Sequence, residues 1–593
     1  MCGIVGYTGK RQAQPILLNC LAHLEYRGYD SCGIAVADSS LSVFKDVLRV
    51  KEIAQVAPRL SGVTGIGHTR WATHGEPSKI NAHPHCDCAG KIAVVHNGII
   101  NNFSELKQRL ISEGHKIVSQ TDSEVIPHLV EQYFHGDLEE AVAHALEDLE
   151  GSYAIIVMMA GEPRLVAARK DSPLIIGVGD QENFLGSDVP AVLDYTNRVI
   201  YLEDEDLAVL TTDEVSVRHR GRKVKREQQQ VSWTVEDARK GGYEHFMLKE
   251  IHEQPKVIRE TLAEYIALGE PEESFTAADG TIGGLRLVAC GTSYHAAMIG
   301  RYLIEELVRV PVRVEIASEF CYSGQVASGE RAIVITQSGE TADVLKAARL
   351  LRDKGCPVTA ITNVVGSTVS RLANNVIYTR AGPEISVPAT KTFMAQLMAL
   401  YWLALPFARI DNRTQDSLIM ELRQLPEKVQ QVLDNHAPII ECARELAKAE
   451  NVFFISRGIN YPVVLEGALK LKEISYLHAE GYAAGELKHG PFALLGTPTP
   501  VVAVVGKDNT YDAMLASIKE VKARKSPVIA VVPEDDTGVA ELVDTVLYVP
   551  PIPPVLSPVV NTVVLQLLAY YTARERGCPI DFPRNLAKSV TVE

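Results

Sequence analysis

The sequence has little of what would mark a secreted or disulfide-stapled protein. Only 10 of its 593 residues are cysteines, too few for a disulfide scaffold in a chain of this length. Its first residues, MCGIVGY, have neither the positive segment nor the apolar segment of a signal peptide. These absences together predict a cytoplasmic protein in a reducing compartment.

Positive charge and long apolar runs are also scarce. Lysine and arginine number 59 against 74 aspartates and glutamates, a net charge of −15. This balance argues against nucleic acid or an anionic membrane as the main partner, although local basic pockets remain allowed. The two most apolar runs, FMAQLMALYWLALPFA and NTVVLQLLAYY, each carry a glutamine and are short for a membrane span. We therefore expect both to be buried helices.

Two patterns of secondary structure divide the chain, which is too long for one hydrophobic core. Up to about residue 200, short β-rich runs such as CGIVGYT, CGIAVAD and IAVVHNGII predominate. They predict a layered α+β domain of antiparallel sheets, residues 1–240, with a glycine-marked linker at its end. Beyond it, strands and helices alternate, which is typical of a parallel, doubly wound α/β sheet.

The α/β part contains an internal repeat. Cys356-Pro357-Val358 followed by TAIT matches Ser526-Pro527-Val528 followed by IAVV, and the two stretches are 170 positions apart. Asn375 and Thr545 open a second matching pair at the same offset. We infer that one α/β unit was duplicated, which predicts two similar domains at 241–425 and 426–593.

Cys2 occupies the only position where a nucleophilic side chain can share its residue with a free α-amine. Met1 precedes a small residue, and its removal would expose an amine with a pKa of about 7.7–8.0. That amine can act as the general base for its own thiol. The alternative is that Cys2 is simply a small buried residue, as most free cysteines are.

Downstream residues supply what a thiol attacking a carboxamide requires. The Asn97 side-chain amide and the Gly98 backbone N–H would form an oxyanion hole. Arg70 and Asp122 would bind the α-carboxylate and the α-ammonium of an amino-acid substrate.

A hydroxyl-rich turn, TQSGET, follows an apolar strand pattern and precedes a helix pattern. Gly339 in this turn allows close backbone approach, and the helix N-terminus favours an anion. The alternative is an ordinary capped turn. A second donor-rich turn of the same unit, CGTSYHA with Ser293, favours a phosphate cradle.

Three ionisable residues share one face of a predicted helix. Glu466, Lys470 and Glu473 have the spacing i, i+4, i+7. They could be a solvated ion pair, but their apolar neighbours favour pKa values tuned for proton transfer. His489, in a loop bounded by glycine and proline, could open a sugar ring. Lys588, near the end of the sequence, would by itself be expected in a solvated tail.

These motifs resemble a known family. YRGYDS, TRWATHG, HNGIINN and QTDSE are similar to the N-terminal-nucleophile glutaminase domain of class II glutamine amidotransferases. EISYLHAE, GELKHGP and PRNLAKSVTVE resemble the glutamine–fructose-6-phosphate aminotransferase (isomerizing) family, which has two sugar isomerase (SIS) domains. The resemblance implies an αββα first domain and conversion of fructose 6-phosphate to glucosamine 6-phosphate with glutamine as nitrogen donor.

The resemblance also implies residue roles. Cys2 would form a γ-glutamyl thioester and release ammonia, and Lys588 would hold the sugar as a Schiff base. Glu473, assisted by Lys470, would move a proton between C1 and C2, and His489 of a neighbouring subunit in a homodimer would open the ring. The glutamine pocket would comprise Arg70, Trp71, His74, Gly98 and Asp122. The sugar phosphate would bind Ser293, Thr336, Gln337, Ser338, Thr341 and the backbone of Val387.

The chain departs from the family pattern at Thr336, in the run PEISVPATK and at Cys32, which stands where alanine is common. Thr336 stands where serine is expected, and it keeps the hydroxyl. In PEISVPATK, Pro388 stiffens the loop and Ala389 lacks an expected hydroxyl.

The run HPHCDC raises a metal site as an alternative. Its cysteine spacing is not C-x₂-C, so Cys86 and Cys88 are interpreted as loop thiols. We expect no metal and no cofactor. A related SIS-domain amidotransferase or deglycase acting on another sugar phosphate, and a catalytically silent sugar-phosphate sensor, remain as alternative functions.

Overall fold

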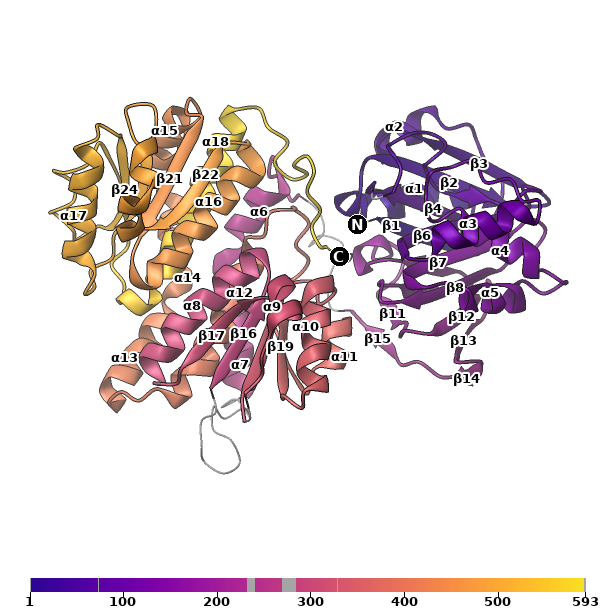
Figure 1. Ribbon diagram of the computed structural model, residues 1–593, viewed down its shortest axis with the longest axis horizontal. Coiled ribbons are helices and arrows are strands. Elements are labelled where there is room, and N and C mark those ends of the chain that lie inside the picture. The colour runs from indigo at the N-terminus through magenta and orange to yellow at the C-terminus, as the bar shows by residue number, and fades with distance from the viewer. Residues whose placement is uncertain (1, 73, 232–239, 269–283, 328, 591–593) are drawn as a thin grey trace. The chain divides into compact units, whose positions relative to one another are not determined.

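A computed structural model describes the chain except for residues 1, 73, 232–239, 269–283, 328 and 591–593 (Figure 1). Met1 and the last three residues of PRNLAKSVTVE therefore lie outside the described residues. The chain forms two compact units, Met1–Arg239 with Ser589–Glu593, and Lys240–Lys588. The predicted boundary at 425 and 426, inside the second unit, stays a prediction.

The first unit contains two antiparallel sheets. One has the order β15-β11-β9-β10-β1-β4-β2-β3 and the other the order β14-β13-β12-β8-β7-β6-β5. The strands of the first sheet are β1 (Gly3–Thr8), β2 (Ser31–Ala37), β3 (Leu41–Asp46), β4 (Thr64–Arg70), β9 (Ile175–Val178), β10 (Asn183–Gly186), β11 (Arg198–Tyr201) and β15 (Gln228–Gln230). The strands of the second are β5 (His85–Cys86), β6 (Ile92–Ile100), β7 (Gly151–Met159), β8 (Leu165–Lys170), β12 (Asp206–Leu210), β13 (Val215–His219) and β14 (Arg222–Val224).

The two sheets pack face to face with helices on their outer faces. Both faces of each sheet are covered because side chains alternate along the strands, as β6 shows. Ala93 and Val95 pack in the core between the sheets, whereas Ile92 and Val94 pack in the core beneath the helices. The helices over the second sheet are α3 (Phe103–Ser112), α4 (Val125–Tyr133) and α5 (Leu138–Glu147), and those over the first are α1 (Ala13–Ala22) and α2 (Val50–Val56). The predicted αββα arrangement is confirmed.

The second unit contains two parallel five-stranded sheets with the same strand order. The first, β17-β16-β18-β19-β20, consists of β16 (Leu285–Ala289), β17 (Val312–Ile316), β18 (Arg331–Thr336), β19 (Val358–Thr362) and β20 (Asn375–Tyr378). The second, β22-β21-β23-β24-β25, consists of β21 (Asn451–Ser456), β22 (His478–Ala483), β23 (Val501–Val504), β24 (Val528–Pro533) and β25 (Thr545–Val549). The predicted repeat is confirmed, since β19 and β24 begin 170 positions apart.

Helices cover both sheets, and one continuous apolar core extends from the first sheet to the second. The first half contributes α6 (Phe246–His252), α7 (Gln254–Leu268), α8 (Gly291–Leu307), α9 (Ala317–Ser323), α10 (Ala342–Asp353), α11 (Thr368–Leu372) and α12 (Lys391–Ala404). The second contributes α13 (Asn412–Arg423), α14 (Leu425–Asp434), α15 (Ala437–Leu446), α16 (Tyr461–Ser475), α17 (Tyr511–Lys522) and α18 (Ser557–Glu575). Figure 1 shows α16 and α18 side by side against the second sheet.

Helices α12 and α18 are the two apolar runs of the sequence. Helix α18 is long and apolar enough to cross a membrane, but the whole of its apolar window is buried inside the protein. Every residue of α12 except Trp402 is buried. Both helices therefore contribute to the core, as the mid-run glutamines predicted.

The strand order creates a switch point in each sheet. The chain leaves β16 for β17 on one side and later places β18 on the other. The carboxyl ends of β16 and β18 therefore flank a crevice, which is where ligands bind in open parallel sheets. The turns CGTSYHA and TQSGET follow these two strands.

Candidate active sites

Cys2 immediately precedes β1, and its thiol lies against the residue that follows β4. The Trp71 N–H donates to Cys2 Sγ at 3.2 Å, and Sγ lies 3.4 Å from Trp71 O. Burial raises the pKa of the thiol, while the Trp71 N–H and the Arg70 guanidinium oppose that shift. A partly buried thiol with an amide donor on its sulfur suits a nucleophile that becomes anionic.

Asn97 and Gly98 lie in β6 and bring the predicted oxyanion donors to Cys2. Asn97 Nδ2 donates to Cys2 O at 2.8 Å. Gly98 has φ +137°, and a Cβ added there would lie 2.0 Å from Ser152 O on β7. Only glycine fits this position, because both the backbone conformation and the neighbouring strand exclude a side chain.

Arg70 and Asp122 are both buried in the same region. The Arg70 guanidinium donates to Gly75 O at 2.9 Å and Glu76 O at 3.3 Å, and also to His74 O. The Asp122 carboxylate accepts from Ile100 N–H at 2.8 Å. The charges of Arg70 and Asp122 both act on the Cys2 thiol, so the two predicted substrate-binding groups lie near the nucleophile.

Trp71 and His74 belong to the segment after β4 that is organised around Arg70. The Trp71 ring meets Tyr29 edge-on at 5.7 Å, and the His74 ring meets Phe103 in the same manner at 5.3 Å. Arg27, to which no role was assigned, donates from Nε to Cys2 O at 3.3 Å. Its place in YRGYDS was the only sequence signal for it.

The TQSGET turn joins β18 to α10 and is internally hydrogen-bonded. Thr336 Oγ1 lies 3.0 Å from Thr341 Oγ1 and accepts the Gly339 N–H at 3.3 Å. Gly339 has φ +69°, and a Cβ there would lie 2.1 Å from Ser367 Oγ. The Thr336 hydroxyl therefore holds the turn closed beside the helix N-terminus.

The other predicted phosphate contacts lie on neighbouring segments. Ser293, in the first turn of α8, accepts from Gln396 Nε2 of α12 at 3.0 Å. The Val387 N–H donates to Asp581 O at 2.9 Å, which ties the loop after β20 to the C-terminal segment. Gln337 O accepts the Asn363 N–H at 3.1 Å, so the turn is also anchored to the segment after β19.

The three ionisable residues of α16 form a buried cluster rather than a solvated face. Lys470 Nζ donates to Glu473 Oε2 at 2.6 Å and lies 3.4 Å from Glu466 Oε1. The Lys470 and Glu466 side chains are 1% and 0% exposed, and that of Glu473 is 19% exposed. Burial raises the pKa of Glu473, partly offset by Lys470. A carboxylate with a raised pKa suits a proton-transfer base.

Helix α8 connects this cluster to the first sheet. Thr292 Oγ1 donates to Glu466 Oε1 at 3.0 Å, and His295 Nδ1 lies 2.7 Å from Glu466 Oε2. Ser293 is between these two residues. Glu466 therefore fixes the cluster next to the switch point of the first sheet.

Lys588 is not a solvated tail residue. Its side chain is 5% exposed, and its Nζ pairs with the fully buried carboxylate of Glu384 in the loop after β20. Glu384 also accepts from the Thr390 N–H at 2.9 Å and from the Thr392 N–H and hydroxyl at 3.1 and 2.7 Å. The charge of Lys588 acts on Glu473, so both predicted sugar-site groups lie in one region.

Glu384 was not singled out from the sequence, although it stands in PEISVPATK. The loop keeps its shape without a hydroxyl at Ala389, because Glu384 binds the two threonines that follow. Glu250 of α6 supports the same loop, since its Oε1 accepts from the Ile385 and Ser386 N–H groups at 2.6 and 3.1 Å. Burial and the Glu384 charge raise the pKa of Glu250 to about 8.

Among the described residues, the predicted sugar-site residue His489 has no hydrogen-bond or ion-pair partner in the cluster around Glu473. It is exposed at the end of a short helical turn, residues 484–489, after β22. No hydrogen bond or ion pair joins its ring to another described residue of this chain. Its expected role in a neighbouring subunit thus stays a prediction.

Among the described residues, the side chains of HPHCDC do not by themselves form a group of three or more possible metal ligands. His83 and His85 are buried, His83 stacks on His68 at 4.0 Å, and burial keeps the pKa of each well below its ordinary value. Cys86 belongs to β5 and Cys88 is exposed.

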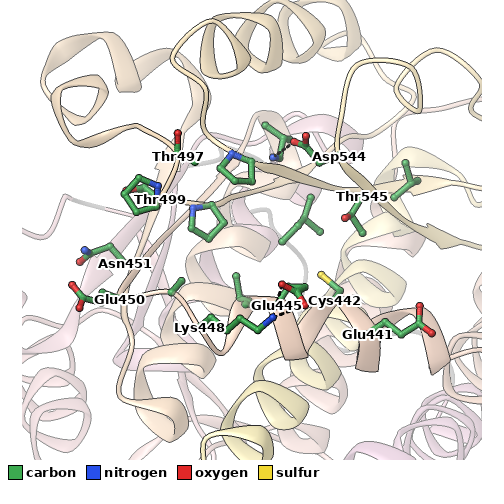
Figure 2. A pocket seen from close by; sticks show the side chains of 18 of the residues that line it. Glu441, Cys442, Glu445, Lys448, Glu450, Asn451, Thr497, Thr499, Asp544 and Thr545 are labelled. Carbon is green, nitrogen blue, oxygen red and sulfur yellow. Dashed lines mark hydrogen bonds and ion pairs between the residues drawn. The ribbon is translucent and has the colours of Figure 1, made fainter.

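A groove of about 980 Å³ lies at the opposite edge of the second sheet from the switch point (Figure 2). It is lined by residues at the amino ends of β21, β24 and β25, such as Asn451, Val528 and Thr545. Figure 2 shows carboxylates on its rim, among them Glu441 and Asp544. Those charges do not suit a phosphate, and no predicted site residue lines the groove.

Comparison with known proteins identifies matching families over most of the chain. The SIS domain family model matches residues 285–406 and 445–576, and a glutamine amidotransferase domain model matches residues 68–194. The glutamine–fructose-6-phosphate aminotransferase [isomerizing] of Methanosarcina acetivorans is 50% identical over 618 aligned residues, covering 100% of both chains. The same enzyme of Caldanaerobacter subterraneus is 49% identical over 610 aligned residues, with the same coverage.

Solved structures also resemble part of this chain. The C-terminal domain of glucosamine-fructose-6-phosphate aminotransferase from Francisella tularensis is 38% identical, with a TM-score of 0.54. It covers 58% of this chain and is itself covered completely.

Proposed function

The chain belongs to the glutamine–fructose-6-phosphate aminotransferase (isomerizing) family, and from this premise we propose how its residues carry out the reaction. The enzyme converts D-fructose 6-phosphate and L-glutamine to D-glucosamine 6-phosphate and L-glutamate. The first unit releases ammonia from glutamine, and the second unit incorporates that ammonia into the sugar.

Glutamine hydrolysis begins with attack of the Cys2 sulfur on the γ-carboxamide carbon. The α-amine of Cys2, free once Met1 is removed, takes the thiol proton. Asn97 Nδ2 and the Gly98 N–H hold the oxyanion, while Arg70 and Asp122 hold the α-carboxylate and α-ammonium. Ammonia leaves, and water then hydrolyses the thioester to glutamate. The 2.8 Å contact of Asn97 with Cys2 supports this assignment.

Trp71 and His74 complete the glutamine pocket. The Trp71 N–H on Cys2 Sγ stabilises the developing thiolate. The carbonyl of His74 takes one of the Arg70 hydrogen bonds, so the segment around His74 positions the guanidinium.

The sugar reaction uses an imine at C2. Lys588 Nζ adds to the open-chain carbonyl with loss of water, and ammonia then displaces the lysine to leave an imine of the sugar. Glu473 removes a proton from C1 and returns it to C2, and Lys470 stabilises the carboxylate in its charged form, before the first transfer and after the second. Ser293, Thr336, Gln337, Ser338, Thr341 and the Val387 N–H hold the phosphate.

We further infer a homodimer that acts in the cytoplasm, without a nucleic-acid or membrane partner. His489, exposed and unengaged by described residues of its own chain, would open the sugar ring in the site of the partner copy. The net charge of −15 is consistent with the absence of a polyanionic partner.

The single observation that carries the proposal is the buried ion pair of Lys588 with Glu384. It holds an amine from the far end of the chain where its charge acts on Glu473. Burying an ammonium is costly unless it is paired, and the pair with Glu384 keeps this amine close to the proposed proton-transfer base.

The test is transfer of ¹⁵N from amide-labelled glutamine into sugar, measured with fructose 6-phosphate and with other ketose and aldose phosphates. We expect labelled glucosamine 6-phosphate from fructose 6-phosphate alone. Release of labelled ammonia with no amino sugar, or amination of a different sugar phosphate, would replace this function with that of a related SIS-domain enzyme.

A further inference from the structure

Four potential metal ligands from three segments of the first unit converge on one point. Cys88 lies in the turn between β5 and β6, His115 follows α3, and His128 and Glu131 lie three residues apart on α4. One ligand atom from each of the four lies within 4.8 Å of the ligand atoms of the other three. None of these residues belongs to either site described above.

Three of four distances between these atoms match the edges of a zinc-centred tetrahedron, and the fourth, between His115 and Glu131, is shorter. Cys88 Sγ lies 3.6 Å from His115 Nδ1 and 3.5 Å from His128 Nδ1. Glu131 Oε2 lies 3.0 Å from His115 Nδ1 and 3.5 Å from His128 Nδ1. Zinc bonds of about 2.3 Å to sulfur and about 2.0–2.1 Å to nitrogen and oxygen give tetrahedral edges of about 3.3–3.6 Å.

The surroundings also suit anionic ligands. The Lys116 N–H donates to Cys88 Sγ at 3.4 Å, and the Cys88 N–H donates to Glu131 Oε2 at 3.1 Å. Behind His128, its second ring nitrogen faces Glu124 Oε1 at 3.9 Å. Backbone donors on the thiolate and a carboxylate behind an imidazole are the second layer of contacts that metal ligands use.

We propose that Cys88, His115, His128 and Glu131 bind one zinc ion in a closed, four-coordinate structural site. A thiolate with two imidazoles suits zinc and excludes magnesium and calcium, which take oxygen ligands. Four protein ligands leave no open position for a substrate, which is the mark of a structural site. Binding releases the Cys88 thiol proton to solvent, and no electron is transferred.

The ion would fix the segment that leads to the glutamine pocket. His115 begins the stretch that ends at Asp122, and along it the Val118 and Ser119 N–H groups donate to Glu124. The ion would therefore join this stretch to α4 and to the β5–β6 turn. Its loss is expected to raise KM for glutamine and to leave ammonia-dependent amino-sugar formation unchanged.

Neither HPHCDC nor any other local run predicted this site. HPHCDC supplies only one ligand, Cys88. The other three, His115, His128 and Glu131, follow it by 27, 40 and 43 positions. The proposal of a metal site therefore rests on the folded geometry, whereas the expectation of no metal came from comparing only residues close together in the chain.

The experiment uses the full-length protein purified without a metal-affinity tag. Metal content is measured by plasma mass spectrometry for wild type, Cys88→Ser and His128→Gln, with Cys86→Ser as the matched thiol control. We expect about one zinc per chain in wild type and Cys86→Ser, and less than a tenth of that in the other two. Zinc added to chelator-treated protein should raise Tm only where Cys88 and His128 are present.

Cobalt substitution of wild type keeps the proposal testable if a variant fails to fold. Co²⁺ bound here should give tetrahedral visible bands and a thiolate charge-transfer band. Absence of zinc and cobalt binding by wild type would leave only a hydrogen-bonded cluster and overturn the proposal. A full zinc complement in Cys88→Ser would overturn it equally.

Discussion

Replacing Glu384 with glutamine tests directly how Lys588 is held in the sugar site. The variant keeps the side-chain size and one oxygen that can accept from Thr390 and Thr392. It removes the negative charge that pairs with Lys588 and can turn an amide NH₂ toward the ammonium. Lys588 then loses its ion-pair partner in the described part of the chain.

The size of the effect follows from the burial of this pair. Breaking a buried ion pair costs about 3–5 kcal/mol, and a hydrogen bond to a charged group contributes about 1.5–3 kcal/mol. Without its partner, Lys588 can turn its ammonium toward water, which reduces the loss. We therefore expect the variant to lose about 2–3 kcal/mol of transition-state stabilisation, at the low end of these values. That corresponds to a fall of about 30- to 150-fold in kcat/KM for fructose 6-phosphate.

The assay separates this effect from glutamine chemistry and from unfolding. Amino-sugar formation is measured with ammonia in place of glutamine, and borohydride is used to trap fructose 6-phosphate on Lys588. Both should fall in Glu384→Gln, while glutamine hydrolysis by the first unit stays unchanged. Glu264→Gln, which breaks the more exposed ion pair with Arg380 in the same unit, is the matched control.

Two results would refute the reasoning. A Glu384→Gln enzyme within twofold of wild type would show that the pair does not position the amine. Undiminished borohydride trapping together with slow turnover would assign Glu384 to a later step instead.

Three further predictions follow from the described geometry. Cys2→Ala should abolish glutamine-dependent synthesis yet keep ammonia-dependent synthesis, and amino sugar made from glutamine would contradict the nucleophile assignment. Gly98→Ala would place a Cβ 2.0 Å from Ser152 O at a φ of +137°, so it should lower the free energy of unfolding by at least about 1–3 kcal/mol. An unchanged Tm of the first unit in calorimetry would contradict this prediction. In the folded protein the pKa of Glu250 is raised from 4.5 to about 8. Between these two pH values Glu250 keeps its proton in the folded state and has lost it in the unfolded state. The free energy of unfolding therefore falls as the pH rises from 4.5 to about 8, by at most about 1.4 kcal/mol per pH unit. Glu250→Gln should flatten this slope in pH-dependent urea unfolding, and an unchanged slope would mean that Glu250 is ionised when folded.

Local sequence patterns were sufficient for the elements and for the chemistry of the motifs. Short β-rich runs predicted strands such as β1 and β6, and the 170-residue offset predicted two similar α/β domains. These features depend on side-chain pattern and on duplication, and both can be recognised from the order of residues alone. Cys2 was also singled out this way, because the role proposed for it depends on its position next to Met1.

The contacts that place functional groups depended on residues distant in sequence. Glu384 and Lys588 are 204 positions apart, and no pattern paired them, because a buried charge finds its partner only once the core closes around both. The same holds for Cys88 with His115 and His128: exposed or polar residues in three segments become one cluster only when β5, β6 and α4 pack together.

What the sequence by itself determined was therefore the reaction class, the fold class of each region and the repeat, and it supplied the candidates for the reacting residues. Tertiary structure alone decided which buried carboxylate holds Lys588, that Glu466 joins α16 to α8, and that Cys88 has three potential ligands beside it. The physical reason is that periodicity and motif chemistry are local, whereas the pairing of buried charges is decided by the packing that removes water from around them.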